Sequence, residues 1–183
     1  MAIICFHKPD EENVFLSNWY MSDFSVDGAM YSSMEQYMMY MKAKVFKDEV
    51  IASQILQTSN VAEIKALGRG VSNYNDSVWN GMRQLLVYKG LREKFAQNED
   101  LKKRLLSTNN NYLAECAVND RIWGIGLSMK DPDRLHIGKW KGQNLLGGAP
   151  VRRLKYKWVK FLLWQSVANS QYLALEPKPR GKV

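Results

Sequence analysis

The chain has 183 residues, of which 46% are hydrophobic and 24% are charged, and these values are typical of a globular protein with one domain. No stretch approaches the ~20 consecutive apolar residues of a membrane-spanning helix, and acidic residues from position 10 onward argue against a signal peptide. Cys5 and Cys116 form no CxxC pair, and there are only two histidines, which disfavours a zinc site. The composition therefore predicts a cytoplasmic protein without a metal and without a membrane association.

The formal net charge of +8 at pH 7 has two interpretations. One is an anionic partner, either a phosphorylated small molecule or a nucleic acid. The other is a solvated basic surface with no specific partner. The charge alone does not decide between them, and the oligomeric state is not indicated by any pattern in the sequence.

The hydrophobic pattern is mainly helical. Helices are predicted over residues 32–46, 48–58, 60–68, 76–97, 101–106 and about 145–173. The third is expected to start at Asn60, with Glu63 three residues later in a capping-box-like pair, and to stop at Gly68, which leaves Arg69 at its exit. Pro150 means that the last helix either starts after this residue or bends there. In the helix over 76–97, apolar residues occur at helical spacing and are expected to face the core. They are Val78, Met82, Leu85, Leu86, Leu91 and Phe95.

Two later segments change character. Residues 112–118 and 121–127 are predicted to be short extended segments around a polar turn at positions 119–121. We therefore expect a mainly α fold with a few short β-strands, built as a single domain over residues 1–170. Residues 171–183, with their prolines and basic side chains, are expected to form a loosely ordered tail.

The helix over residues 32–46, SSMEQYMMYMKAKVF, is apolar on nearly every side, yet it carries Glu35 and Lys42 on one face. Helical spacing places these two residues on a stripe with Met38, Met39 and Phe46. In one interpretation Glu35 caps the helix start and Lys42 extends to solvent. In the other, both line the floor of a pocket, where burial lowers the pKa of the lysine and raises that of the glutamate.

Two further segments combine polar side chains with glycine. NDRIWGIG, residues 119–126, offers an indole surface for stacking and glycines that allow a close approach of the backbone to a ligand. Its alternative interpretation is a turn with a surface ion pair and a core tryptophan. KWKGQNLLGG, residues 139–148, is similar in kind to a phosphate-holding loop before a helix, although it matches no nucleotide-binding fingerprint.

Taken together, these segments occur in a recognisable order. The motifs are FLSNWY (15–20), FSVDGAMYSSMEQYMMYMKAKVF (24–46), ALGRG (66–70), KF (94–95), QN (97–98), LL (105–106), LAECAVNDRIWGIGL (113–127) and WKGQNLLG (140–147). Their succession over about residues 3–160 resembles the NADAR family, which is also called YbiA-like. Two departures are visible: Tyr40-Met41 replaces a small residue and a glutamine, and Ala149-Pro150 interrupts the start of the last helix.

This resemblance implies a YbiA-like, mainly helical fold and an N-glycosidase activity that needs no metal or cofactor. The reaction is hydrolysis of the bond between ribose C1′ and a nitrogen. The substrates implied are phosphoribosyl-aminopyrimidine intermediates of riboflavin biosynthesis and ADP-ribosyl-guanine in DNA or RNA. A binding module that recognises ADP-ribose or nucleic acid without turnover is the alternative.

The resemblance also implies the site residues. The catalytic positions are Lys42, Glu35 and Asp120. The substrate-binding positions are Asn18, Tyr20, Arg69, Arg121, Trp123, Gly124 and Asn144. Lys42 either attacks C1′ as a nucleophile or stays charged and holds a phosphate, while a carboxylate moves protons or activates water. The sequence leaves both roles open.

Overall fold

The computed structural model describes residues 1–7, 12–148, 151–152, 154–156 and 158. Its helices are α1 (Met34–Val45), α2 (Glu49–Leu56), α3 (Val61–Arg69), α4 (Asp76–Gln97) and α5 (Glu99–Ser107). Its strands are β1 (Ile3–Phe6), β2 (Met21–Val26), β3 (Ala29–Ser33) and β4 (Tyr112–Glu115), and short 3-10 helices lie at η1 (Val14–Leu16), η2 (Pro132–Leu135) and η3 (Ile137–Lys139). The predicted mainly α fold with a few short strands is confirmed.

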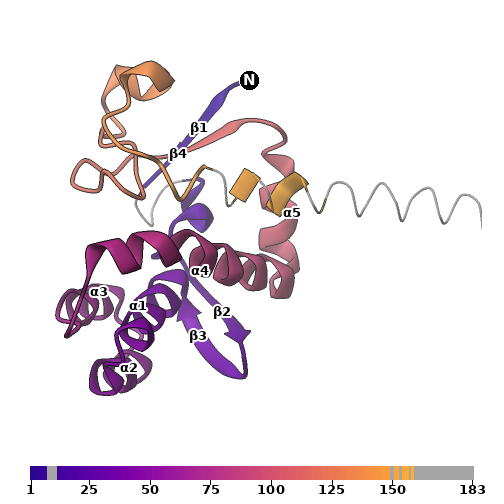
Figure 1. The fold of residues 1–183 in the computed structure, drawn as a ribbon. Helices are drawn as coiled ribbons and strands as arrows, with labels where there is room; N and C mark the ends of the chain where they lie inside the picture. The colour runs from indigo at the N-terminus through magenta and orange to yellow at the C-terminus, as the bar shows by residue number, and fades with distance from the viewer. Residues whose placement is uncertain (8–11, 149–150, 153, 157, 159–183) are drawn as a thin grey trace, which may run out of the picture.

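Helix α1 packs against α2, α3 and α4, and this central place explains why nearly all of its faces are apolar. In Figure 1 the helices α1 to α3 lie on one side of the long helix α4, and the β1–β4 pair lies on its other side. The helix start is capped by the hydroxyl of Ser33, which accepts a hydrogen bond from the Gln36 N–H at 3.2 Å. Glu35 is therefore not the cap of this helix.

Helix α4 has the predicted extent, but the prediction of its buried face was partly wrong. Exposed fractions of 46%, 41% and 71% are found for Val78, Met82 and Leu85. The buried face instead includes Trp79, Val87 and Gly90. A Cβ atom at Gly90 would collide with the ring of Tyr37 on α1, so the glycine permits a close approach of the two helices that fixes which face of α4 is buried.

Helix α3 starts with Asn60 as its N-cap, as its sequence suggested, and the side chain accepts hydrogen bonds from the N–H groups of Ala62 and Glu63. The predicted end of the helix at Gly68 was too early. The helix continues to Arg69, and its C-cap is Gly70. Gly68 has a packing role: a Cβ atom there would overlap the Met39 side chain of α1. Its small size lets α3 lie directly against α1.

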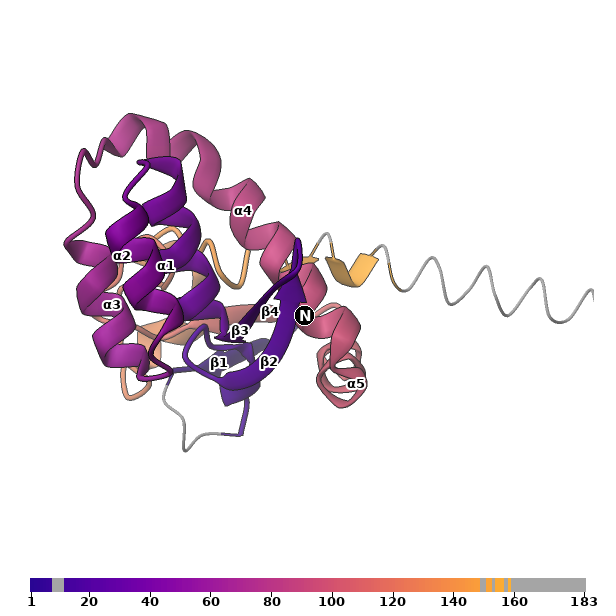
Figure 2. The same ribbon diagram turned by 90° about the horizontal axis from the view of Figure 1, so that it is seen from below.

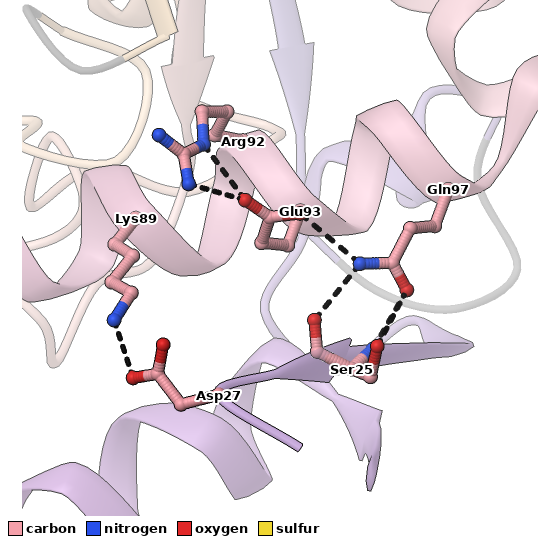
Figure 3. A network of polar contacts seen from close by, with 6 residues as sticks. All are labelled: Ser25, Asp27, Lys89, Arg92, Glu93 and Gln97. Carbon is pink, nitrogen blue, oxygen red and sulfur yellow. Dashed lines mark hydrogen bonds and ion pairs between the residues drawn. The ribbon is translucent and has the colours of Figure 1, made fainter. Parts of the chain in front are cut away.

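The strands form two separate pairs. β2 and β3 are antiparallel, and their turn at Asp27 and Gly28 has positive φ angles of 51° and 84°, as expected for a two-residue hairpin turn. Figure 3 shows how α4 holds this hairpin. The side-chain amide of Gln97 accepts from the Ser25 N–H and donates to its carbonyl oxygen, each at 2.8 Å, and Lys89 pairs with Asp27.

The second pair consists of the parallel strands β1 and β4, which run from Ile3 opposite Tyr112 to Phe6 opposite Glu115. Seen from below in Figure 2, α1, α2 and α3 lie side by side, and the strands lie toward the end of α4 that leads into α5. Glu115 is the last residue of β4. The chain continues from it directly into the predicted polar turn at positions 119–121.

The prediction of a second extended segment over residues 121–127 was wrong. These residues form turns rather than a strand. The segment is held by residues 141–146, whose N–H groups donate to the carbonyl oxygens of five successive residues from 121 to 125 at 2.8–3.2 Å. Gly126 has a φ of +69°, a backbone conformation that strand residues do not adopt.

The C-terminal part is only partly described. Residues 151–152, 154–156 and 158 are helical, which agrees with a helix that starts after Pro150. The predicted continuation of this helix to residue 173 and the predicted tail over residues 171–183 lie outside the described residues. Within the part of the chain that is described, no helix is long and apolar enough to cross a membrane.

Candidate functional site

A cavity of about 670 Å³ opens between α1, α3, the N-terminal end of α4 and the segments around residues 18–19 and 115–123. This volume lies within the range of small-molecule binding sites. Seven of the ten residues predicted for the site line it, namely Asn18, Glu35, Lys42, Arg69, Asp120, Arg121 and Trp123. The sequence motifs that lie far apart along the chain thus meet at one cavity.

Helix α1 supplies the floor of this cavity. Glu35, Met38, Met39 and Lys42 all line it, so the predicted stripe with spacing i, i+3, i+4 and i+7 is confirmed for these four residues. Phe46, the fifth member of the stripe, is buried outside the cavity and packs edge-on against Tyr74 with ring centroids 5.2 Å apart. The methionines form an apolar wall between the acid and the amine.

Glu35 is a buried carboxyl group with an exposed fraction of only 3%. Its backbone N–H donates to the Asn18 carbonyl oxygen at 2.9 Å, while its Oε1 atom has no hydrogen-bond partner. The pKa of Glu35 is raised to about 7, chiefly by burial and also by the charge of Asp120, while Lys65, a hydrogen bond with Trp19 and Arg69 act against the rise. A carboxyl group with this pKa can both donate and accept a proton near neutral pH.

Lys42 is half-buried and points toward the end of α3. Its Nζ donates to the carbonyl oxygen of Gly68 at 2.7 Å and lies 4.2 Å from the centroid of the Tyr74 ring. Burial lowers the pKa of Lys42, and the charge of Asp76 works against this shift. Among the described residues, no carboxylate lies within ion-pair distance of this amine, so nothing neutralises it locally. The lowered pKa gives Lys42 a larger fraction of the neutral, nucleophilic form than an exposed lysine has, whereas the contacts with the Gly68 carbonyl and the Tyr74 ring stabilise the charged form.

Asp120 and Trp123 belong to the turn that closes the cavity opposite α1. One carboxylate oxygen of Asp120, Oδ1, accepts hydrogen bonds from the N–H groups of Ile122 at 3.0 Å and of Trp123 at 2.8 Å. These bonds fix the orientation of the carboxylate and of the tryptophan together. The alternative interpretation is partly confirmed, because these residues form a turn and Trp123 is largely buried in the core. Its surface ion pair between Asp120 and Arg121 does not occur in the described structure.

The three other predicted site residues do not line the cavity. The side-chain amide of Asn144 donates to the Leu113 carbonyl oxygen at 2.8 Å and accepts from the Glu115 N–H at 3.1 Å. Gly124 accepts a hydrogen bond from the Asn144 N–H at 3.0 Å. The ring of Tyr20 faces Lys94, and the Lys94 Nζ atom lies 5.5 Å from the centroid of this ring. Asn144 and Gly124 therefore support the wall of the cavity, and the loop over residues 139–148 shows no role as a phosphate cradle at this site.

Among the cavity residues that were not singled out from the sequence are Trp19, Lys65 and Glu115. Trp19 and Glu115 lie inside motifs that were quoted, FLSNWY and LAECAV, so a polar or aromatic residue within an otherwise buried motif was the available signal. Lys65 has no such signal, because its place on α3 four residues before Arg69 becomes meaningful only once α3 packs against α1. Within the described ranges, no group of three or more His, Cys, Asp and Glu side chains is arranged to hold a metal ion.

The sequence matches that of known proteins. The model of the NADAR domain family matches residues 5–153. N-glycosidase R617 of Acanthamoeba polyphaga mimivirus is 44% identical over 119 residues, which cover 65% of this chain and 70% of that protein. N-glycosidase YbiA of Escherichia coli is 30% identical over 146 residues, which cover 80% and 82% of the two chains. A riboflavin biosynthesis protein, VVA0006 of Vibrio vulnificus, is 32% identical over 67% of this chain and 33% of its own length.

The fold agrees with these similarities. The NMR structure of E. coli YbiA superposes with a TM-score of 0.73 at 28% sequence identity and covers 88% of each chain. The family model spans most of the chain, two of these relatives bear the name N-glycosidase, and the predicted motifs meet at one cavity. The chain therefore belongs to the NADAR family and is a hydrolase of N-glycosidic bonds.

Proposed function

We propose that the cavity binds a phosphorylated ribosyl group and hydrolyses the bond between ribose C1′ and the nitrogen of a base. ADP-ribosyl-guanine in DNA or RNA and the phosphoribosyl-aminopyrimidine intermediates of riboflavin biosynthesis are the two substrate classes. The observation that carries this proposal is the meeting of Lys42, Glu35 and Asp120 at one cavity of about 670 Å³. The similarity to a riboflavin biosynthesis protein supports the second class.

The charges around the cavity suit a phosphorylated sugar. Lys65 and Arg69 lie one turn apart on α3, and Arg121 faces the cavity from the closing turn. Guanidinium groups bind phosphate oxygens with paired donors. These three cations can hold the phosphates, which leaves Lys42 free for the reacting carbon.

In the proposed reaction Lys42 is the nucleophile. Its amine lone pair forms a bond to C1′, the C1′–N bond breaks, and the electron pair of that bond leaves with the base nitrogen, which takes up a proton. Glu35 accepts the proton that the lysine nitrogen loses. The ribosylamine formed on Lys42 opens at the ring oxygen to a Schiff base between C1′ and the lysine nitrogen. Water then adds to C1′ and gives up one proton to solvent, and the lysine amine leaves with the proton from Glu35. The fixed carboxylate of Asp120 stabilises the positive charge that develops on the sugar.

The test is release of free base from each substrate class. Purified protein is incubated with an ADP-ribosylated guanine oligonucleotide and, separately, with the ribosylamino-pyrimidine phosphate, and the products are separated by chromatography. Release from at least one substrate by the natural chain, and none by Lys42→Ala, is expected. An inactive natural chain on both substrates would contradict the proposal.

A further inference from the structure

The cavity contains a third carboxyl group that the proposed reaction has not used. We propose that Glu115 is the acid that delivers a proton to the departing base, an inference that rests on the proposed function. Glu115 is the last residue of β4, lines the cavity, and belongs to the wall opposite α1.

The backbone of Glu115 is held on both sides. Its N–H donates to Oδ1 of Asn144 at 3.1 Å, and its carbonyl oxygen accepts from the Ile125 N–H at 2.8 Å. Asn144 also donates to the carbonyl oxygen of Leu113 at 2.8 Å, so one buried amide clamps β4 on either side of Ala114. This clamp gives the carboxyl group a fixed position before substrate arrives, as a proton donor requires.

The carboxyl group itself is polar and incompletely satisfied. Its Oε2 atom is shut off from solvent and has no hydrogen-bond partner. A buried, unpaired carboxylate is costly, and the neutral acid is the less costly form. The pKa of Glu115 is raised to about 8, chiefly by burial and also by the charges of Asp120 and Glu35, while Lys65 acts against the rise. The remaining charged groups that line the cavity are Lys42, Arg69 and Arg121.

Glu35 and Glu115 lie on different walls of the cavity, and we assign a different proton transfer to each. Glu35 stands on the same face of α1 as Lys42, two turns before it, and the proposed reaction assigns to it the exchange of protons with the amine. Glu115 lies on the wall that also carries Trp123, a largely buried ring that lines the cavity and that we assign to contact with the base. The proton of Glu115 therefore passes to the base nitrogen as the C1′–N bond breaks, and the resulting carboxylate is reprotonated from water before the next turnover. No other reactant is needed.

The experiment compares Glu115→Gln with the natural chain and with Glu99→Gln, a control at an exposed glutamate of α5. Rates of base release are measured from pH 5 to pH 10 on the substrate that the natural chain cleaves. General acid catalysis is worth ~10²–10⁴-fold, so we expect Glu115→Gln to lower kcat by at least about 100-fold at pH 7 with little change in KM. The activity of the natural chain should fall above about pH 8, and the residual activity of the variant should lack this fall.

The outcomes separate the two proposals. If the natural chain releases no base, the proposed function fails. If the natural chain is active but Glu115→Gln keeps its kcat within a few fold, or keeps the fall in activity at high pH, only the role of Glu115 is overturned. Should Glu115→Gln not fold, the pH profile of the natural chain decides, because constant activity up to pH 10 contradicts a proton donor in this place.

Discussion

The Nζ atom of Lys42 and the carbonyl oxygen of Gly68 are 2.7 Å apart and share a hydrogen bond. This contact joins the last turns of α1 and α3. It exists because Gly68 has no side chain at the place where Met39 packs. The position of the proposed nucleophile therefore depends on how closely two helices approach each other.

The first prediction concerns Lys42 itself. Lys42→Ala should abolish base release and leave the fold intact, because the side chain is only half-buried and no ion pair is lost. With borohydride present during turnover, the natural chain should gain the mass of a ribosyl adduct on Lys42. Lys44→Ala, at an exposed lysine of the same helix, is the control and should keep its activity. A fully active Lys42→Ala would eliminate the nucleophile, and an inactive variant without any adduct in the natural chain would favour the phosphate-holding role.

A second prediction concerns the helix contact. Gly68→Ala adds a methyl group that overlaps the Met39 side chain, and overpacking of this kind costs ~1–3 kcal/mol. A displacement of α3 should also move the Gly68 carbonyl oxygen that binds Lys42, and should therefore lower kcat. Gly81→Ala is the matched control, because a Cβ atom at this α4 position meets nothing within 4 Å, and it should stabilise the fold by ~0.5–1 kcal/mol. Urea unfolding and base release measure both effects. Equal stabilities of the two variants would contradict the packing role of Gly68.

These contacts mark the limit of what the sequence could predict. The stripe from Glu35 to Lys42 follows from helical periodicity alone, and the cap at Asn60 follows from local chemistry, so both were predicted. The buried face of α4 was partly mispredicted. A glycine adds nothing to the hydrophobic pattern of a helix, yet Gly90 is the residue that allows the close contact with Tyr37. Periodicity describes one helix at a time, whereas this face is selected by the partner helix.

The site shows the same distinction. The motifs identified seven cavity residues, but they could not separate a residue that touches the cavity from one that supports its wall. Asn144 and Gly124 carry motif signals as strong as that of Trp123, yet their polar atoms bind the backbone of β4 and of residue 144. Glu115 was missed because a carboxylate at a strand end looks exposed until the turn over residues 119–126 folds across it.

A third prediction follows from the raised pKa of Glu35. The folded chain keeps the proton of this group up to about pH 7, whereas the unfolded chain releases it near 4.5. The free energy of unfolding contributed by Glu35 therefore falls as the pH rises from about 4.5 to about 7, and the full penalty persists above pH 7. Glu35→Gln removes this penalty. Since each pKa unit is worth about 1.4 kcal/mol, the stability of the variant relative to the natural chain should be greater at pH 8 than at pH 4 by on the order of 3 kcal/mol.

Urea unfolding of the natural chain and of Glu35→Gln at pH 4 and pH 8 measures this difference. Glu63→Gln, on the exposed side of α3, is the control and should show no comparable dependence on pH. A stability difference between Glu35→Gln and the natural chain that is the same at both pH values would show that the carboxyl group titrates normally.

The last prediction concerns Lys94, which is fully buried in α4. Its Nζ donates to the carbonyl oxygens of Phe15 at 2.9 Å and Ser17 at 3.3 Å. These carbonyls belong to the segment that continues to Asn18, whose own carbonyl oxygen receives the Glu35 N–H. Lys94→Met keeps the length of the side chain but leaves two buried acceptors unpaired, at a cost of ~1–3 kcal/mol for each. The loosened segment should also lower kcat/KM for base release.

The dependence on pH distinguishes this role from simple packing. Burial lowers the pKa of Lys94 to about 7, so between about pH 7 and the ordinary lysine value the unfolded chain holds a proton that the folded chain has lost. The free energy of unfolding of the natural chain should therefore rise with pH across this window, and that of Lys94→Met should lack this contribution. The loss of stability caused by Lys94→Met should thus be larger at pH 9 than at pH 6. If the loss is equal at both values, the buried amine is not neutral at high pH, and its hold on the segment before Asn18 is that of a permanent charge.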